Sequence, residues 1–497
     1  MLTIFHQLIP FLLGRGGIAQ NKCNGSSGRG ESGIPYCHEA IHVNCLAPNY
    51  HEWIETKNKI GKDLFMANNF NSTYHVKPIK GPVHLSLSVP GSKSITNRAL
   101  LLAALADGTS TLYGTLFSED SRHFLSCLQE LGFPVTIDEE HCIVTVTGYG
   151  GNIPKKEASI YVGSAGTAAR FLTAMLGFSN GIYHLDASEQ MRKRPMKPLL
   201  DALASIGSHI TYHGAEGCFP FTITGSSCNK NSIEINIGNS SQFLSALLMS
   251  APLMPNGLSI TLVGEKHSLS YVNITTHMMK QFGCQVETQK EGHYIIPAHQ
   301  NYQPQNYQIE PDMSAACYFY ALAPLLGGSV QVSHIHLDSM QGDIQFLTIL
   351  EQMGCSLIDS DKGILLKCDM PRTYPGFDID LSSCSDQTMT LAALAPFASS
   401  PVTIRNISHI RLQESNRIEA ILTELTRMGI TCKELPDGIF IEPGIPKAAS
   451  IETYNDHRMA MAFSLIGLLV PGIIIQNPAC CKKTFETYFD ILDTIVK

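Results

Sequence analysis

One short stretch decides the fold: PGSKSITNR, residues 90–98, followed by the apolar run ALLLAAL, residues 99–105. Gly91 permits a tight turn. Ser92 or Ser94 is placed to cap the helix that the apolar run predicts. The free N–H groups and the positive dipole end of that helix attract anions. We therefore expect a helix start that binds an anion.

Two basic side chains strengthen this expectation. Lys93 adds a positive charge beside the helix start. Arg98 lies one turn beyond Ser94 and carries a planar fork that suits phosphate or carboxylate. An ordinary capped helix with surface charges explains this stretch equally well when it is taken alone. The stretch is not a P-loop, because the full glycine, lysine and hydroxyl spacing is absent.

Recurrence favours a functional role. A small polar cluster before an apolar, alanine-rich helix appears six times, at intervals of roughly 71–76 residues. The further clusters lie at residues 163–167, 239–242, 312–314, 385–388 and 455–458, before helices expected over residues 168–176, 243–251, 315–326, 389–397 and 459–469. A fixed period of this length indicates internal repeats.

A second helix in each copy supports the repeat. These helices are expected over residues 122–131, 196–206, 272–282, 344–353 and 417–428. Each ends at a glycine, the usual helix stop, and a strand-like segment follows. The sixth copy, residues 485–497, runs into the chain end, and alternation over residues 83–89 predicts a strand before the first copy. The pattern predicts an α/β protein of two similar domains, each a threefold repeat of a small α/β unit.

Composition agrees with this architecture. A chain of 497 residues is too long for one ordinary core, so two domains are the default. The net charge of −8 argues against a general nucleic-acid or membrane-surface binder. The fifteen cysteines show neither a CxxC pair nor the spacing of a zinc site. We expect them to be reduced, in a cytoplasmic protein.

Residues 1–65 do not fit the repeat. Residues 2–13 are apolar but too short for a membrane span and form a poor signal peptide, and residues 25–33 are rich in glycine and serine. Two interpretations remain open: a disordered extension, or a translation start assigned too early, with Met66 as the real start. The second is slightly favoured. An organelle-targeting peptide fits less well, because the stretch contains few arginines.

Several polar residues of the first three copies fit an anion site. Asp120 is expected to cap the second helix of the first copy, with positioning of Lys93 or Arg98 as the alternative. The basic triplet 192–194 is expected to point one member inward. The remaining candidates are Gly166, Thr167 and Arg170 in the second copy, and Ser240, Ser241, Gln242, Ser268 and Tyr271 in the third.

The last three copies carry carboxylates at the equivalent positions. Each carboxylate alone fits helix capping, but the set favours function. We expect the helix starts of the two halves to face one another across a cleft that suits anionic substrates and proton transfer. These residues are Asp312, Asp343, Asp386 and Glu414, joined by the cations Arg417, Arg458 and Lys483.

At this point the chain resembles the 5-enolpyruvylshikimate-3-phosphate synthase family, the 3-phosphoshikimate 1-carboxyvinyltransferases. The resemblance covers roughly residues 72–497 in the right order. The motifs are residues 90–94 with Asn97 and Arg98, Gly166-Thr167 with Arg170, Arg194-Pro195, Ser240-Ser241-Gln242, residues 339–343 and residues 454–461. It implies an inside-out α/β barrel of the enolpyruvyl transferase type, with domains at residues 92–309 and at 72–91 plus 310–497.

The resemblance also implies the reaction. Phosphoenolpyruvate donates its carboxyvinyl group to the 5-hydroxyl of 3-phosphoshikimate, by addition and then elimination of phosphate. No metal or organic cofactor is implied. Asp386 is the candidate base on the hydroxyl, Glu414 the candidate for proton traffic at the methylene carbon, and Lys93 a third catalytic candidate.

Substrate contacts follow by position. The implied 3-phosphoshikimate contacts are Lys93, Ser94, Arg98, Ser240, Ser241, Gln242, Ser268, Tyr271, Asp386, His409 and Gln413. The implied phosphoenolpyruvate contacts are Lys93, Ser164, Gly166, Arg194, Gln242, Arg417, Arg458 and Lys483.

Three positions depart from the family pattern. Ser164 stands where the family usually has Asn, and its shorter hydroxyl still donates. Gln413 stands where the family usually has Lys, which removes a charge and a candidate for proton transfer. His409 stands where the family usually has Asn or another polar residue, and can supply the missing donor. We expect activity to survive, with the proton roles in question.

Competing hypotheses remain. A UDP-N-acetylglucosamine enolpyruvyl transferase shares the fold but lacks the Lys-Ser and Asp-His-Arg-Met-Ala motifs. A non-catalytic anion-binding homologue is favoured only by Gln413, and a purely structural repeat protein does not need a clustered cation set. We expect a monomer whose domains hinge near residues 90 and 310 and close on substrate binding.

Overall fold

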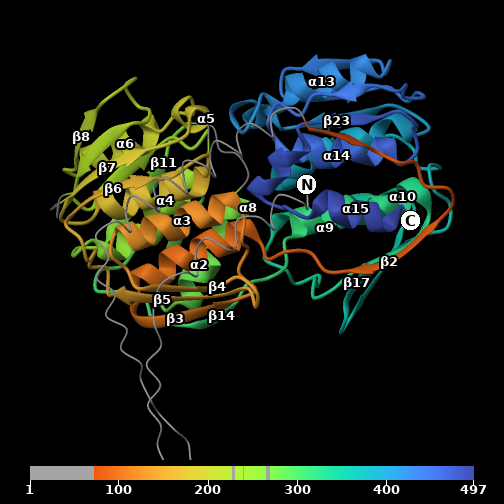
Figure 1. The fold of residues 1–497 in the computed structure, drawn as a ribbon. Coiled ribbons are helices and arrows are strands. Elements are labelled where there is room, and N and C mark those ends of the chain that lie inside the picture. Colours follow the sequence, from red (N-terminus) through yellow and green to blue (C-terminus); the bar gives the residue numbers. More distant parts are fainter. Residues whose placement is uncertain (1–71, 226–229, 239, 265–268, 497) are drawn as a thin grey trace, which may run out of the picture. The chain divides into compact units, whose positions relative to one another are not determined.

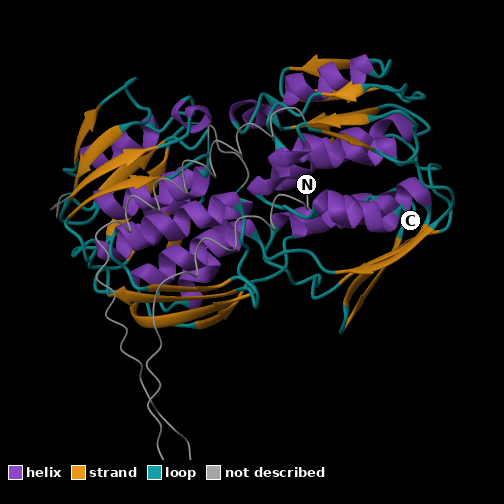
Figure 2. Cartoon of the chain, in the orientation of Figure 1, coloured by secondary structure: helices purple, strands orange, loops and turns teal. Residues whose placement is uncertain are grey.

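The computed structural model describes residues 72–225, 230–238, 240–264 and 269–496, all within one compact unit, Asp63–Lys497 (Figure 1). The predictions for residues 1–65 lie outside the described residues. Within these ranges no helix is long and apolar enough to cross a membrane. The described chain forms six small sheets, five of four strands and one of three, with helices packed against them (Figure 2).

The second copy shows the repeating unit most completely. Its order is β6 Glu157–Tyr161, α4 Gly166–Gly177, β7 Ile182–Asp186, α5 Glu189–Arg192, α6 Lys197–Ser205, β8 His209–Tyr212 and β9 Phe221–Thr224. Strands β6 and β7 are parallel, as a connection through a helix allows, and the β8–β9 hairpin adds antiparallel strands beside β7.

The other units of the first three copies repeat this plan. They comprise α2 Lys93–Leu105, β3 Asp107–Tyr113, α3 Glu119–Glu130, β4 Val135–Asp138 and β5 Ile143–Tyr149, then β10 Ser232–Ile235, α7 Gln242–Ser250, η1 Ala251–Leu253, β11 Leu258–Leu262, α8 Ser270–Gln281, β12 Glu287–Lys290 and β13 His293–Ile296.

The last three copies follow with more 3₁₀ turns. The fourth copy contains α9 Met313–Tyr320, α10 Leu322–Leu326, β15 Gly328–Val332, η2 Gly342–Gln345, α11 Phe346–Gln352, β16 Ser356–Ser360 and β17 Gly363–Cys368. The fifth copy contains β18 Asp378–Asp380, η3 Ser382–Gln387, α12 Thr388–Leu394, η4 Ala395–Phe397, β19 Val402–Arg405, η5 Ser408–Leu412, α13 Arg417–Arg427, β20 Cys432–Leu435 and β21 Gly438–Ile441. The sixth copy contains β22 Ser450–Ile451, α14 His457–Gly467, β23 Ile474–Gln476, η6 Pro478–Lys483 and α15 Tyr488–Ile495.

Three strands complete sheets far from them in sequence. β14, Asn306–Gln308, pairs with β3 of the first copy, whereas β2, Val83–Leu87, pairs with β15 of the fourth. β1, Thr73–His75, pairs with β23 and completes the sixth copy, which the sequence leaves short. The two connecting segments cross at a backbone bridge between Gly91 and Pro311.

The central helices are buried on all sides, which explains their alanine-rich, uniformly apolar sequences. Every residue of α4 and nearly every residue of α2 is buried, and α14 is buried along its whole length. Two hydrophobic cores result. The N-terminal core contains buried residues from Ile95 to Ile309, and the C-terminal core contains those from Val76 to Val89 and from Met313 to Leu492. The domain boundaries stay a prediction.

The predicted helices and glycine stops are confirmed, with local differences. Gly132, Gly207 and Gly283 follow their helices with positive φ, as do Gly354 and Gly429. The helix expected over residues 315–326 is broken at Ala321 into α9 and α10, three residues before Pro324, whose missing N–H interrupts the hydrogen-bond ladder. Proline also ends the next central helix early, because Pro396 lies in the 3₁₀ turn η4.

One capping prediction holds in position only and the other is wrong. Ser92 is the N-cap of α2 as predicted, but its side chain makes no capping hydrogen bond. Asp120 lies inside α3, whose N-cap is Ser118 in a capping box with Ser121. The alternative prediction holds for Asp120, since its carboxylate lies 3.7 Å from the Lys93 ammonium.

Replacing Leu172 by alanine tests the N-terminal core. Leu172 on α4 is fully buried, so the cavity should cost about 2–5 kcal/mol of unfolding free energy. The same change at Leu337, which is 52% exposed, should cost well under 1 kcal/mol. Urea denaturation followed by circular dichroism measures both variants. Equal midpoints would contradict the buried position of Leu172.

Candidate functional site

The starts of the central helices converge on one cavity. It is lined from the first residues of α2, α4 and α7 by Lys93, Thr167 and Gln242, and from the C-terminal core by Asp386 and Arg458. An adjoining pocket reaches the starts of α9 and α14. Helix starts present unpaired N–H groups and a positive dipole end, so their convergence favours anions.

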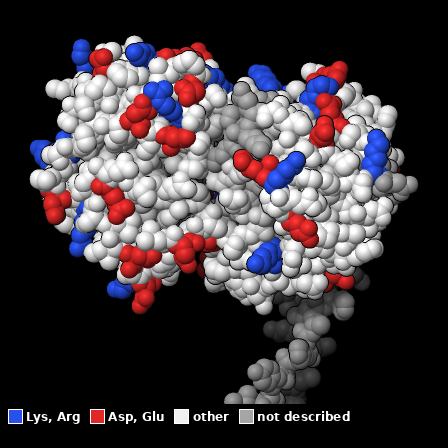
Figure 3. All heavy atoms as spheres, turned by 180° about the vertical axis from the view of Figure 1, so that it is seen from behind, with Lys and Arg blue, Asp and Glu red and all other residues white. Residues whose placement is uncertain are grey.

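Side-chain charge adds to the helix dipoles. The cavity is lined by six cations, namely Lys93, Arg98, Arg170, Arg194, Arg417 and Arg458, but by only two carboxylates, Asp386 and Glu414. This excess is local, because the whole chain carries −8. On the outer face drawn in Figure 3, acidic and basic side chains are interspersed, and neither sign gathers into one large patch. The cavity is therefore a site for ligands with several negative charges.

Two buried arginines from the N-terminal core have no carboxylate partner among the described residues. Arg98 donates to Thr275 Oγ1 at 2.8 Å, to the Ser94 carbonyl at 2.8 Å and to the Tyr271 carbonyl at 3.0 Å. Arg170 donates to the Gly166 carbonyl at 3.1 Å, and its Nε has no hydrogen-bond partner. Burial lowers the pKa of Arg98 to about 10 and that of Arg170 well below its ordinary value.

Further buried donors point to a missing anion. Arg194 Nε and Lys483 Nζ lack hydrogen-bond partners, although both groups lie near Glu414. Arg194 is the inward member of the basic triplet, with 12% of its side chain exposed against 46% for Arg192 and 74% for Lys193. A buried donor without an acceptor is costly, so a ligand oxygen is the expected partner.

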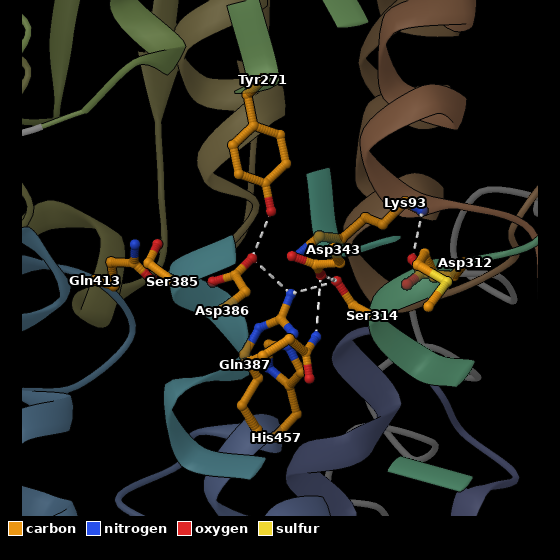
Figure 4. A network of polar contacts seen from close by, with 12 residues as sticks. Lys93, Tyr271, Asp312, Ser314, Asp343, Ser385, Asp386, Gln387, Gln413 and His457 are labelled. Atoms are coloured by element: carbon orange, nitrogen blue, oxygen red, sulfur yellow. Dashed lines mark hydrogen bonds and ion pairs between the residues drawn. The ribbon is translucent and has the colours of Figure 1, made fainter. Parts of the chain in front are cut away.

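Asp386 is held by both cores. It accepts hydrogen bonds from Tyr271 at 2.6 Å (Figure 4), from Arg458 at 2.7 Å and from Arg417 at 3.0 Å. Burial alone would raise the pKa of Asp386, but Arg458 and Arg417 outweigh it and lower the pKa to about 2. The carboxylate is charged at neutral pH.

Glu414 lies among three cations. Its oxygens are 3.0 Å from Arg417, 3.3 Å from Lys483 and 3.8 Å from Arg194. Burial raises the pKa of Glu414, yet Lys483 and Arg417 together hold the pKa well below its ordinary value. Both carboxylates therefore take the place that an anionic ligand would occupy beside these cations.

A second layer fixes the two arginines of the C-terminal core. Asp456, the N-cap of α14, accepts from the Arg458 N–H at 3.0 Å and from Arg417 Nε at 2.8 Å. Asp343 accepts from Gln387 at 3.0 Å and from the Ser314 hydroxyl, whose oxygen accepts from Arg458 at 3.3 Å (Figure 4). Burial and the charge of Asp386 raise the pKa of Asp343 to about 6.

The structure brings most predicted site residues together. The cavity is lined by Lys93, Ser94, Arg98, Arg194, Ser240, Ser241, Gln242, Tyr271, Asp386, His409, Gln413, Glu414, Arg417 and Arg458. Ser164 and Lys483 line an adjoining cavity that shares Glu414. Gly166 lies against Arg170 and Arg194, whose guanidinium nitrogens a Cβ at this position would approach within about 3 Å. Ser268 lies outside the described residues.

Some predicted site residues have partners that their sequence positions do not reveal. Arg170 repeats the arrangement of Arg98: each guanidinium bonds the carbonyl four residues earlier. Asp343 and Asp456 lie near helix starts as expected, but their bonds to Gln387 and Arg417 come from burial in the fold. Among the described residues no group of three His, Cys, Asp or Glu side chains is placed to hold a metal ion.

Comparisons with known proteins agree with this geometry. The family model of EPSP synthase (3-phosphoshikimate 1-carboxyvinyltransferase) matches residues 76–492. The chain belongs to this family. The 3-phosphoshikimate 1-carboxyvinyltransferase of Nostoc punctiforme is 46% identical over 417 residues, which cover 84% of this chain and 97% of that protein. The enzyme named 3-phosphoshikimate 1-carboxyvinyltransferase 2 from Halalkalibacterium halodurans is 38% identical, covering 85% and 94%.

Solved structures confirm the fold. An EPSP synthase structure from Acinetobacter baumannii aligns with a TM-score of 0.71 at 24% identity, covering 85% of this chain and 98% of that one. The enolpyruvyl transferase NikO from Streptomyces tendae aligns with a TM-score of 0.69 at 15% identity, covering 86% and 98%. The expected inside-out α/β barrel of the enolpyruvyl transferase type is thus confirmed.

Replacing Asp343 by asparagine tests the raised pKa. Folding makes this carboxyl bind its proton more tightly, so the wild type loses stability as the pH rises through the range from about 4 to 6. The asparagine variant cannot ionise there. Its stability relative to the wild type should increase by on the order of 2–3 kcal/mol between pH 4 and pH 7.

Urea denaturation at both pH values measures this difference. Asp369→Asn, on an exposed carboxyl, is the matched control and should show no such change. A pH-independent difference between the Asp343 variant and the wild type would show that this carboxyl has an ordinary pKa.

Proposed function

We propose that this chain transfers the carboxyvinyl group of phosphoenolpyruvate to the 5-hydroxyl of 3-phosphoshikimate, releasing phosphate. The observation that carries the proposal is the cavity with six cations and two carboxylates at converging helix starts. Both substrates carry a phosphate, and phosphoenolpyruvate and 3-phosphoshikimate also each carry a carboxylate. Together they supply the negative charge that the cavity lacks.

Each substrate contacts its own set of residues in the cavity. Arg98, Ser240 and Ser241 face 3-phosphoshikimate from the N-terminal core, with Arg170 as an additional cation. Phosphoenolpyruvate lies among Arg194, Arg458 and the neighbouring Lys93 and Lys483. The buried Nε groups of Arg170 and Arg194, which have no hydrogen-bond partner, support this arrangement, because each can bond a substrate oxygen without losing a hydrogen bond.

Asp386 and Glu414 carry the protons. In the addition step the 5-oxygen bonds to C2 of phosphoenolpyruvate and its proton passes to Asp386, while Glu414, which takes up a proton as the substrate anion competes for Lys483, delivers that proton to the methylene carbon. In the elimination step the bond from C2 to the phosphate oxygen breaks, a proton leaves the methyl carbon to Glu414, and the proton held by Asp386 leaves with the phosphate. When a substrate anion draws Arg458 away, the pKa of Asp386 rises from about 2, so substrate binding strengthens the base.

The domain boundaries at residues 92–309 and at 72–91 plus 310–497 belong to the same proposal. The two separate hydrophobic cores support them. A cytoplasmic monomer is also proposed, and the described cysteines, all of them unpaired, fit a reducing compartment.

Phosphate release tests the function. The purified full chain should release phosphate with both substrates together and not with either alone. No release while 3-phosphoshikimate still binds would favour the second candidate, a catalytically impaired anion-binding homologue, for which Gln413 is the specific observation.

Substitution of the two carboxylates tests the proton roles. Asp386→Asn and Glu414→Gln should each lower kcat by about 10²–10⁴, the range of a positioned acid or base. Asp369→Asn, an exposed change of the same kind, should leave kcat unchanged. Steady-state phosphate release measures all three variants. A kcat within threefold of the wild type for Asp386→Asn would remove this residue from the mechanism.

A further inference from the structure

All five N–H donors of Arg417 are already bonded by this chain's own side chains. The guanidinium donates to Asp456 from Nε at 2.8 Å and from Nη2 at 3.4 Å, to Asp386 from Nη1 at 3.0 Å and to Glu414 from Nη2 at 3.0 Å. The second Nη1 hydrogen goes to the amide oxygen of Gln413. A guanidinium has five such hydrogens, so none is left for a substrate.

The five bonds are unequal. Asp456, Asp386 and Glu414 are carboxylates, and hydrogen bonds between a cation and a carboxylate are stronger than those to a neutral oxygen. Gln413 provides the neutral acceptor. An incoming carboxylate or phosphate therefore displaces Gln413 first, because that exchange leaves all three ion pairs intact.

The location of Gln413 in the cavity agrees with its displacement from Arg417 by a substrate anion. Gln413 and Arg417 both line the main cavity, together with Arg194 and Arg458. The Gln413 side chain is only half-buried, whereas the Arg417 side chain is 1% exposed. The orientation of the amide follows from chemistry, since a guanidinium only donates and the oxygen must face it. The Nε2 group is then left to donate elsewhere.

We infer that Gln413 sets the affinity for phosphoenolpyruvate by occupying, through its amide oxygen, the Arg417 N–H that an acidic group of the substrate must take over. The inference rests on the proposed function. It gives Gln413 a role as a competitor for Arg417, besides its expected contact with 3-phosphoshikimate. A lysine at this position accepts no hydrogen bond and would leave that N–H open.

Two substitutions show whether Gln413 competes with phosphoenolpyruvate for Arg417 or only supports the local structure. Gln413→Met keeps the length and the charge but removes the acceptor, so the KM for phosphoenolpyruvate should fall about threefold to tenfold, as expected for one net hydrogen bond. Gln413→Glu replaces the neutral acceptor by a charged one and should raise that KM about tenfold or more. The KM for 3-phosphoshikimate should not fall in either variant.

The matched control is Gln129→Met on the exposed side of α3, which should leave both KM values unchanged. A side chain that only supports the local structure gives the opposite sign, because its loss raises the KM for phosphoenolpyruvate. An unchanged or raised value in a folded Gln413→Met variant overturns the inference. Should that variant fail to fold, an unchanged KM in Gln413→Glu overturns it equally.

The competition for Arg417 can be tested even if the proposed function fails. If the wild type releases no phosphate, the function fails, but the competition needs only the anion. Calorimetric titration of phosphoenolpyruvate into wild type and Gln413→Met then gives the same comparison through dissociation constants. Tighter binding by the variant supports the inference, and equal or weaker binding overturns it.

Discussion

The structure depends on the positive charge that the fold gathers in the cavity, where six cationic side chains face only two carboxylates. Central helices that are buried on nearly all sides begin around this cavity and the pocket beside it, so the positive ends of their dipoles add to that charge. Such a cluster would be unfavourable without anions nearby. In the C-terminal core the chain supplies them as Asp386, Glu414 and Asp456, while in the N-terminal core Arg98 and Arg170 have no carboxylate partner among the described residues.

This difference between the two cores links the ion pairs of the substrate-free protein to substrate binding and proton transfer. The same arginines that hold Asp386 and Glu414 in the substrate-free protein are placed to bind substrate anions. A ligand that draws Arg458 from Asp386, or Arg194 from Glu414, changes the basicity of that carboxylate at once. Binding and proton transfer are therefore linked through shared hydrogen bonds, with no need for a separate signal between the two cores.

Much of this was visible in the sequence. The repeat of about 71–76 residues predicted six helix starts, and the paired cations and carboxylates at those starts predicted a cleft between two halves. The exact partners were not predictable. Asp120 has the residue type of a cap, yet Ser118 occupies the cap position, and only the packing of α3 against α2 brings Asp120 to Lys93. Asp343 was expected among the site carboxylates, but its burial beside Asp386 and the raised pKa that follows could not be read from the sequence.

The exchange of edge strands has a consequence for how the chain is made. β1 pairs with β23, so the first described strand finds its partner about 400 residues later. β2 likewise waits for β15, and β3 waits for β14. During synthesis from the N-terminus, the sheet of the sixth copy therefore cannot form until β22 and β23 have been made. Contacts so distant in sequence close slowly, so the pairing of β1 with β23 is expected late in folding.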